Sequence, residues 1–94
     1  GIVSGTGSGI GSQTNTTNTA IATPTGGQAP FTYAWTYVSG DNAVILSPTS
    51  AATRFQLNVA PNQFRSGTFR CTVTDAYGTT ASDTVNAEFT HEGF

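Results

Sequence analysis

The chain has 94 residues, of which only 9% are charged, and a formal net charge of −2. It contains 18 Thr and 11 Gly but one His, one Cys and no Lys, which excludes lysine-based catalysis or crosslinking, an internal disulfide and a zinc cluster. The negative charge argues against a nucleic-acid partner, and no apolar run approaches the roughly 20 residues of a membrane helix, so we expect one small domain without nucleic acid, membrane insertion or cofactor.

Residues 1–18 are rich in Gly, Ser and Thr, with glycines at Gly5, Gly7, Gly9 and Gly11. This composition is typical of flexible linkers. The G-x-G-x-G spacing differs from the dinucleotide-binding fingerprint, and no predicted strand leads into it. We therefore predict a flexible arm for residues 1–18. The chain begins with Gly rather than Met, which suggests a processed chain, a tag remnant or an excised piece.

From residue 19 onward, β-branched and aromatic runs alternate with Gly, Pro, Asn and Asp, and no helical periodicity occurs. The predicted strands cover residues 19–23, 31–38, 43–46, 53–59, 67–75 and 79–89. Short strands separated by turn signals every 8–12 residues or so are typical of an all-β sandwich. We assign residues 19–90 to this domain and residues 91–94 to a C-terminal tail.

Alternation within three of these strands predicts the core. Side chains at every second position share one face of a strand, so the apolar phase faces inward. The predicted core residues are Trp35, Phe55, Leu57, Phe69, Cys71 and Val73. We expect Cys71 to act as a small buried hydrophobe and not as a reactive thiol, because no cation or His lies near it in sequence.

Two segments resemble immunoglobulin-like and PKD-like modules. Residues 24–35, PTGGQAPFTYAW, resemble the region leading from strand B into strand C, and residues 67–78, GTFRCTVTDAYG, resemble strand F and the F–G turn. The combination is similar to immunoglobulin-like domains appended to tail, fibre and capsid-decoration proteins of tailed bacteriophages, and to repeats in bacterial surface proteins. The resemblance covers residues 19–90 and implies an immunoglobulin-like β-sandwich of about seven antiparallel strands.

This chain departs from the disulfide-linked members of that group. The expected B-strand region holds Ala20, Ile21 and Ala22, so Cys71 has no partner for the inter-sheet disulfide. Phe69 stands where the tyrosine corner would be and lacks the hydroxyl for its hydrogen bond. We therefore expect a sandwich without the inter-sheet disulfide.

The outward phase of strand 67–75 is polar and suggests a contact face. It carries Thr68 and three candidate contact residues, Arg70, Thr72 and Thr74, and the rings of Tyr37 and Tyr77 lie near loops. These groups suit a partner subunit or a glycan, on which the tyrosines can stack. The alternative is a plain soluble surface built from threonine, which has high strand propensity.

The resemblance implies a non-catalytic module of a bacteriophage virion protein, in a virion or extracellular setting. It would make assembly contacts with repeated virion subunits or attach weakly and multivalently to a host-surface glycan. The alternative is a carbohydrate-binding or spacer module of a secreted bacterial enzyme or adhesin. An enzyme is not expected, because His91 lies in the predicted tail and no G-x-S-x-G nucleophile motif accompanies it.

Both ends of the chain carry hydrophobic residues without an obvious core. They are Ile2, Val3, Ile10, Phe89 and Phe94. We predict that at least one of these ends adds a strand to a neighbouring chain or to the edge of the sandwich.

Overall fold

The computed structural model describes residues 1–93, which form nine β-strands and no helix. The strands are β1 (Ile2–Ser8), β2 (Gln13–Thr16), β3 (Ala20–Ile21), β4 (Thr32–Gly40), β5 (Val44–Ile45), β6 (Ala52–Thr53), β7 (Phe55–Val59), β8 (Gln63–Thr74) and β9 (Thr80–Glu92). The all-β prediction is confirmed. The strands outnumber the predicted ones because residues 1–18 contribute β1 and β2, and the run 53–59 divides into β6 and β7. Within residues 1–93 no helix is long and apolar enough to cross a membrane.

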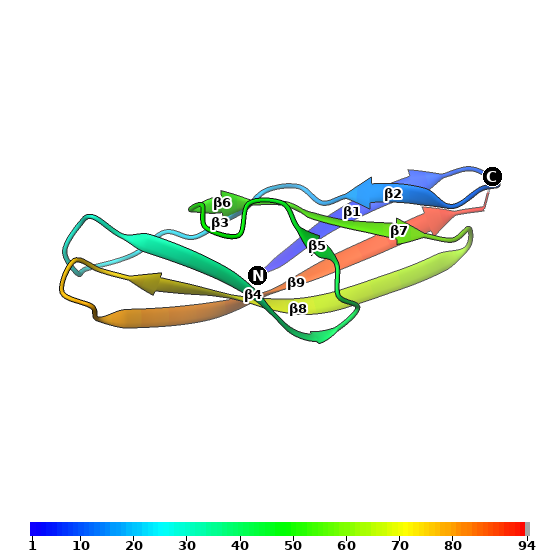
Figure 1. The fold of residues 1–94 in the computed structure, drawn as a ribbon. Coiled ribbons are helices and arrows are strands. Elements are labelled where there is room, and N and C mark those ends of the chain that lie inside the picture. The colour runs from blue at the N-terminus through cyan, green and yellow to red at the C-terminus, as the bar shows by residue number, and fades with distance from the viewer. Residues whose placement is uncertain (94) are drawn as a thin grey trace.

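The strands form an elongated body of two layers, with extents of 51 × 18 × 17 Å (Figure 1). One layer is a four-stranded sheet in the order β1-β9-β8-β4. The other layer holds a three-stranded sheet, β2-β7-β5, and the short pair β3-β6. β1 runs parallel to β9, whereas β8 pairs antiparallel with both β9 and β4.

The long β8–β9 hairpin closes with a turn whose residues suit its geometry. One carboxylate oxygen of Asp75 accepts hydrogen bonds from the backbone amides of Tyr77 and Thr79, each 2.9 Å long. Gly78 has a φ of +83°, a conformation that glycine adopts without a Cβ clash. This turn fixes the register in which Thr74 lies opposite Thr80.

The core lies between the two layers and is built around aromatic rings. Phe55 from β7 stacks on Phe69 from β8 with ring centroids 4.4 Å apart, and Trp35 from β4 meets Phe55 edge-on at 6.1 Å. The Trp35 indole N–H donates a 2.8 Å hydrogen bond to the carbonyl oxygen of Ser50, so the ring is packed in the core and its one polar group is hydrogen-bonded. Cys71 is also buried, and Val73 and Leu57 are partly buried against the same cluster.

Residues 1–18 do not form the predicted flexible arm. β1 pairs with the second half of β9, from Asn86 to Glu92, and Val3 is buried in the core. β2 pairs antiparallel with β7 in the opposite layer. Composition misleads here because backbone hydrogen bonds to an existing sheet edge offset the low strand propensity of Gly and Ser. The segment therefore adds a strand to the edge of its own sheet.

The C-terminal tail predicted for residues 91–94 does not begin at His91. This residue belongs to β9 and is 1% exposed. The His91 Nε2–H donates to the carbonyl oxygen of Gly9 at 3.2 Å, which ties the end of β9 to the turn after β1. Phe89 is fully buried between the layers and belongs to the core, although the sequence analysis placed it among the hydrophobic residues without an obvious core. Phe94 lies outside the described residues.

Candidate functional site

The outer face of the four-stranded sheet is a hydroxyl-rich surface, as the alternation of residues 67–75 predicts. Strand pairing aligns rows of side chains from β4, β8 and β9 across this surface. The rows are Thr36–Arg70–Thr84, Ala34–Thr72–Ser82 and Thr32–Thr74–Thr80. Farther along β8, the Thr68 hydroxyl donates to the Asn86 side-chain oxygen at 2.9 Å. We call the nine side chains of these rows the threonine face.

Arg70 is the single charged side chain of the threonine face. It is exposed, and within residues 1–93 it makes no salt bridge, since the one ion pair there joins Arg65 to Asp41 at 3.6 Å. A guanidinium group offers donors in a planar fork, and hydroxyls both donate and accept. The threonine face can therefore bind a carboxylate or a set of sugar hydroxyls.

The two tyrosines predicted as contacts take different positions. Tyr77 is 81% exposed in the turn that follows Thr74, at one end of the threonine face. Tyr37 points to the opposite side of β4, where its ring packs edge-on against Phe69 at 5.9 Å and its hydroxyl donates to the Gly40 carbonyl oxygen. The structure thus groups Arg70, Thr72, Thr74 and Tyr77 but not Tyr37.

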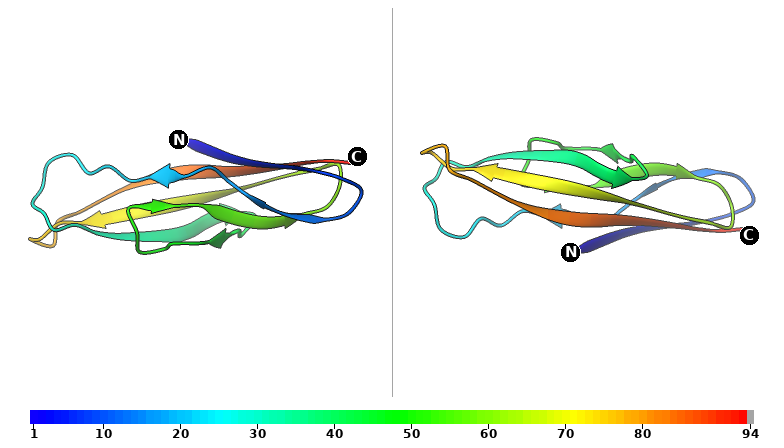
Figure 2. Two further views of the ribbon diagram at one scale, coloured as in Figure 1. Left: turned by 90° about the horizontal axis from the view of Figure 1, so that it is seen from above. Right: turned by 90° about the horizontal axis from the view of Figure 1, so that it is seen from below.

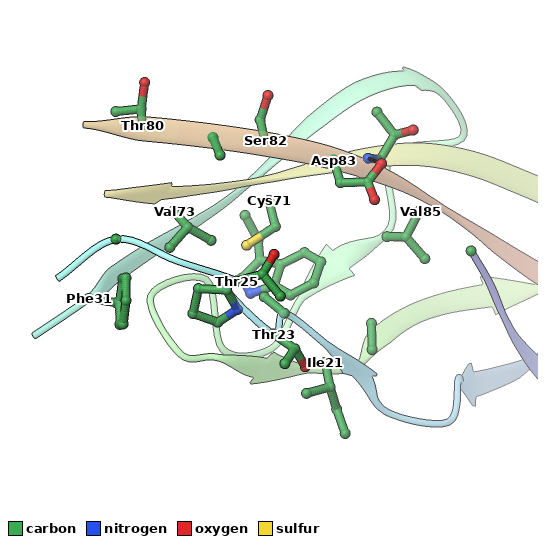
Figure 3. Close-up of a pocket in the computed structure, with 18 of the residues that line it drawn as sticks. Ile21, Thr23, Thr25, Phe31, Cys71, Val73, Thr80, Ser82, Asp83 and Val85 are labelled. Carbon is green, nitrogen blue, oxygen red and sulfur yellow. Dashed lines mark hydrogen bonds between the residues drawn. The ribbon is translucent and has the colours of Figure 1, made fainter. Parts of the chain in front are cut away.

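A groove of about 610 Å³, which was not predicted from the sequence, opens between the layers. One wall is the first half of β9, and the other is the segment from residue 18 to residue 27. Figure 3 shows Cys71, Val73, Asp83 and Val85 pointing into the groove, whereas Thr80 and Ser82 point away from it. A charged residue in the inward phase of a predicted strand, Asp83, was the one available signal.

Cys71 lines the groove but is only 5% exposed. Burial raises the pKa of its thiol above the ordinary value of 9.0, and a backbone hydrogen bond with Ala34 opposes this rise more weakly. Since the thiolate is the nucleophilic form, the native chain holds this sulfur in its unreactive state at neutral pH.

We expect Ellman's reagent to modify Cys71 slowly in the native chain at pH 8 and rapidly in the unfolded chain. Because the folded pKa is raised, the stability that the thiol contributes is fully present below pH 9.0 and is lost as pH rises through the folded value. Urea titrations across alkaline pH, with Cys71→Ala as the control that lacks this titration, measure the effect. Equal thiol reactivity of native and unfolded chains would contradict the burial of the Cys71 thiol.

His91 is the remaining candidate that the sequence raised for chemistry. His91 lies buried near Gly9, and its Nδ1 has no hydrogen-bond partner within residues 1–93. Over the same residues, no three His, Cys, Asp or Glu side chains cluster in a way that could hold a metal ion. No protein-family model matches the chain, and a search of curated proteins finds no match either.

Proposed function

We propose that the chain is a non-catalytic, immunoglobulin-like interaction module, and that the threonine face is its contact surface. Immunoglobulin-like sandwiches place strands G, F and C in one sheet and B, E and D in the other. The order β9-β8-β4 facing β2-β7-β5 supports this assignment, with β1 as an added strand beside G. The pairing of Trp35 on β4 with Cys71 on β8 also supports the proposal, because such domains carry a core tryptophan on strand C and a cysteine on strand F.

The observation that carries the proposed contact role is Arg70, which lies on the middle strand of the threonine face, is exposed and makes no ion pair within residues 1–93. A solvated arginine flanked by Thr36 and Thr84 across the strands is ready to pair with an acidic or hydroxyl-bearing partner. The setting we propose is a repeated structural protein of a bacteriophage virion, in which many copies turn weak contacts into firm assembly or attachment.

A charge reversal at Arg70 tests this role. Particles that carry Arg70→Glu are expected to lose about tenfold or more in incorporation or host adsorption, since a charge-assisted hydrogen bond contributes about 1.5–3 kcal/mol. Arg54→Glu is the matched control, because Arg54 lies in the opposite layer and is also exposed. Equal behaviour of both variants and the parent, with the fold intact by circular dichroism, would refute the assignment.

Glycan binding is the second candidate, and the 81% exposure of the Tyr77 ring supports it. An exposed aromatic ring beside hydroxyl groups suits stacking on a sugar, as in a carbohydrate-binding module of a secreted bacterial protein. A glycan array probed with the tetramerised chain would then show saturable binding that Tyr77→Ala abolishes. Absence of any glycan signal would leave the assembly role as the better proposal.

A further inference from the structure

The outer face of the four-stranded sheet continues beyond the threonine face along β8 and β9. The outward side chains of this second half, which we call the acidic half, are Phe64, Ser66, Glu88, Thr90 and Glu92. The right-hand view of Figure 2 shows the whole outer face, with β8 between β4 and β9 and the second layer behind the sheet. Phe64 is 60% exposed, so the acidic half presents an apolar ring to solvent beside its two carboxylates.

The charged side chains of the outer face are separated by sign. Arg70 lies in the threonine face, whereas Glu88, which is half-buried, and Glu92, which is exposed, lie in the acidic half. Arg70 stands opposite Thr84, and Glu88 follows four residues later on β9, which is about 13 Å farther along the strand. This spacing is too long for an ion pair within one chain. The face is therefore positive toward one end and negative toward the other.

The middle of the outer face is marked by Thr68 and Asn86. These residues lie at the centres of β8 and β9, and the Thr68 hydroxyl donates to the Asn86 side-chain oxygen at 2.9 Å. A two-fold axis that passes above this pair, perpendicular to the strands, places β8 of a second copy over β8 of the first in the opposite direction. Because β8 and β9 extend almost equally to both sides of the pair, the two faces then overlap from end to end. Every contact of such an isologous interface occurs twice.

This inverted arrangement brings unlike charges together. The row of Arg70 and the row that joins Ser66 to Glu88 lie two residues from the axis on opposite sides, so the guanidinium of one copy meets the Glu88 carboxylate of the other. Phe64 and Thr72 lie four residues from the axis on opposite sides, so the exposed ring covers a threonine methyl group of the second copy. With the axis along the strands instead, Arg70 would face Arg70, and the like charges would repel.

We propose that the chain binds a second copy of itself through the outer face of the four-stranded sheet, inverted so that Arg70 of each copy pairs with Glu88 of the other. This inference rests on the contact role proposed above for the threonine face and names the partner. From the rise and spacing of strands, the outer faces of β4, β8 and β9 span about 40 Å by about 15 Å, and a dimer would bury about 1,200 Å² in total. That is the size of a weak interface, which repetition in an assembly strengthens.

Sedimentation equilibrium and NMR dilution series of the full chain test the proposal. We expect half-maximal association at about 0.1–1 mM, with concentration-dependent shifts at the amides of Thr68 and Asn86 and weaker association as NaCl is raised. Arg70→Glu and Glu88→Arg are each expected to weaken association about tenfold or more, because each variant opposes like charges twice in its dimer. Arg54→Glu is the matched control. It makes the same charge change in the opposite layer and is expected to associate like the parent.

A mixture of two variants tests the pairing itself. In a dimer of Arg70→Glu with Glu88→Arg, each of the two contacts again joins an arginine to a glutamate. We therefore expect an equimolar mixture to associate about as tightly as the parent, although each variant alone associates about tenfold more weakly. Recovery in the mixture would also show that both variants are folded.

Three results would overturn the proposal. They are a folded parent chain that stays monomeric at about 1 mM, association that Arg70→Glu leaves unchanged, and a mixture that associates no more tightly than its separate variants. If Arg70→Glu still reduces incorporation or adsorption of particles in any of these cases, the contact role stands and its partner is another molecule. Conversely, association in solution together with unaffected particles would refute the contact role and leave the self-association in place.

Discussion

Replacing Phe55 by alanine is expected to lower the free energy of unfolding by about 3–5 kcal/mol. Phe55 is fully buried, and its ring contacts Phe69 of the opposite layer at 4.4 Å and Trp35 edge-on at 6.1 Å. Its backbone also joins β7 to the segment after β2, since the Phe55 amide donates to the Thr17 hydroxyl at 3.1 Å. Truncation leaves a cavity at the centre of the core that neither sheet can close without losing these contacts.

Phe64→Ala is the matched control, because this ring is 60% exposed on β8. We expect its effect to stay within about 0.5 kcal/mol. Urea denaturation followed by tryptophan fluorescence measures both variants, and similar m-values would show that they unfold over the same surface. Since a domain of this size has a stability of about 5–15 kcal/mol, the loss at Phe55 removes a large share of it. Equal effects at the two positions would contradict the core described above.

Alternation located the core strands because each of them buries one face. In β4 and β8 the period-2 pattern of aromatic and β-branched residues is strong, and it assigns Trp35 and Cys71 to the buried faces of their strands, which the structure then pairs. The same pattern predicted the outward phase of residues 67–75, which holds Arg70. Tyr37 shares the inward phase of Trp35, so its ring packs against Phe69 and does not lie on the threonine face.

β1 and β2 have no comparable signal. Val3 is the single buried hydrophobic residue of β1, and the rest of that strand is Gly, Ser, Thr and the exposed Ile2. What holds β1 is a backbone ladder to β9, more than 80 residues away in sequence. Propensity arguments read local composition, so they cannot detect a strand whose stability comes from distant pairing.

The groove could not be predicted from the sequence for a related reason. It lies beside the first half of β9, next to the ladder that β1 forms with β9 from the Ile2–Asn86 pair onward. No local pattern encodes a register between strands so far apart. Asp83 in the inward phase next to Val85 hints at a break in the core, but the same residue also reads as an ordinary turn or surface acid.

Substitution at Gly5 distinguishes a folded β1 from a flexible arm. A Cβ at Gly5 would lie 2.8 Å from the Thr16 carbonyl oxygen, 2.9 Å from its carbonyl carbon and 3.2 Å from the Thr17 amide nitrogen. These are backbone atoms, so the clash is relieved only if β1 and β2 move apart. We expect Gly5→Val to lower the free energy of unfolding by about 1–3 kcal/mol, the usual cost of overpacking.

Gly11→Val is the control, since a Cβ at Gly11 meets nothing within 4 Å. Its effect should remain within about 0.5 kcal/mol. A flexible arm would tolerate both substitutions equally. Equal stabilities of the two variants in urea would therefore indicate that residues 1–18 are a flexible linker. Moving β2 also strains the pair in which the Thr17 amide donates to the Phe55 carbonyl oxygen at 2.9 Å. Hydrogen exchange in Gly5→Val should accordingly rise at Thr17 and Phe55 as well as along β1, because one close backbone approach couples this edge strand to the centre of the core.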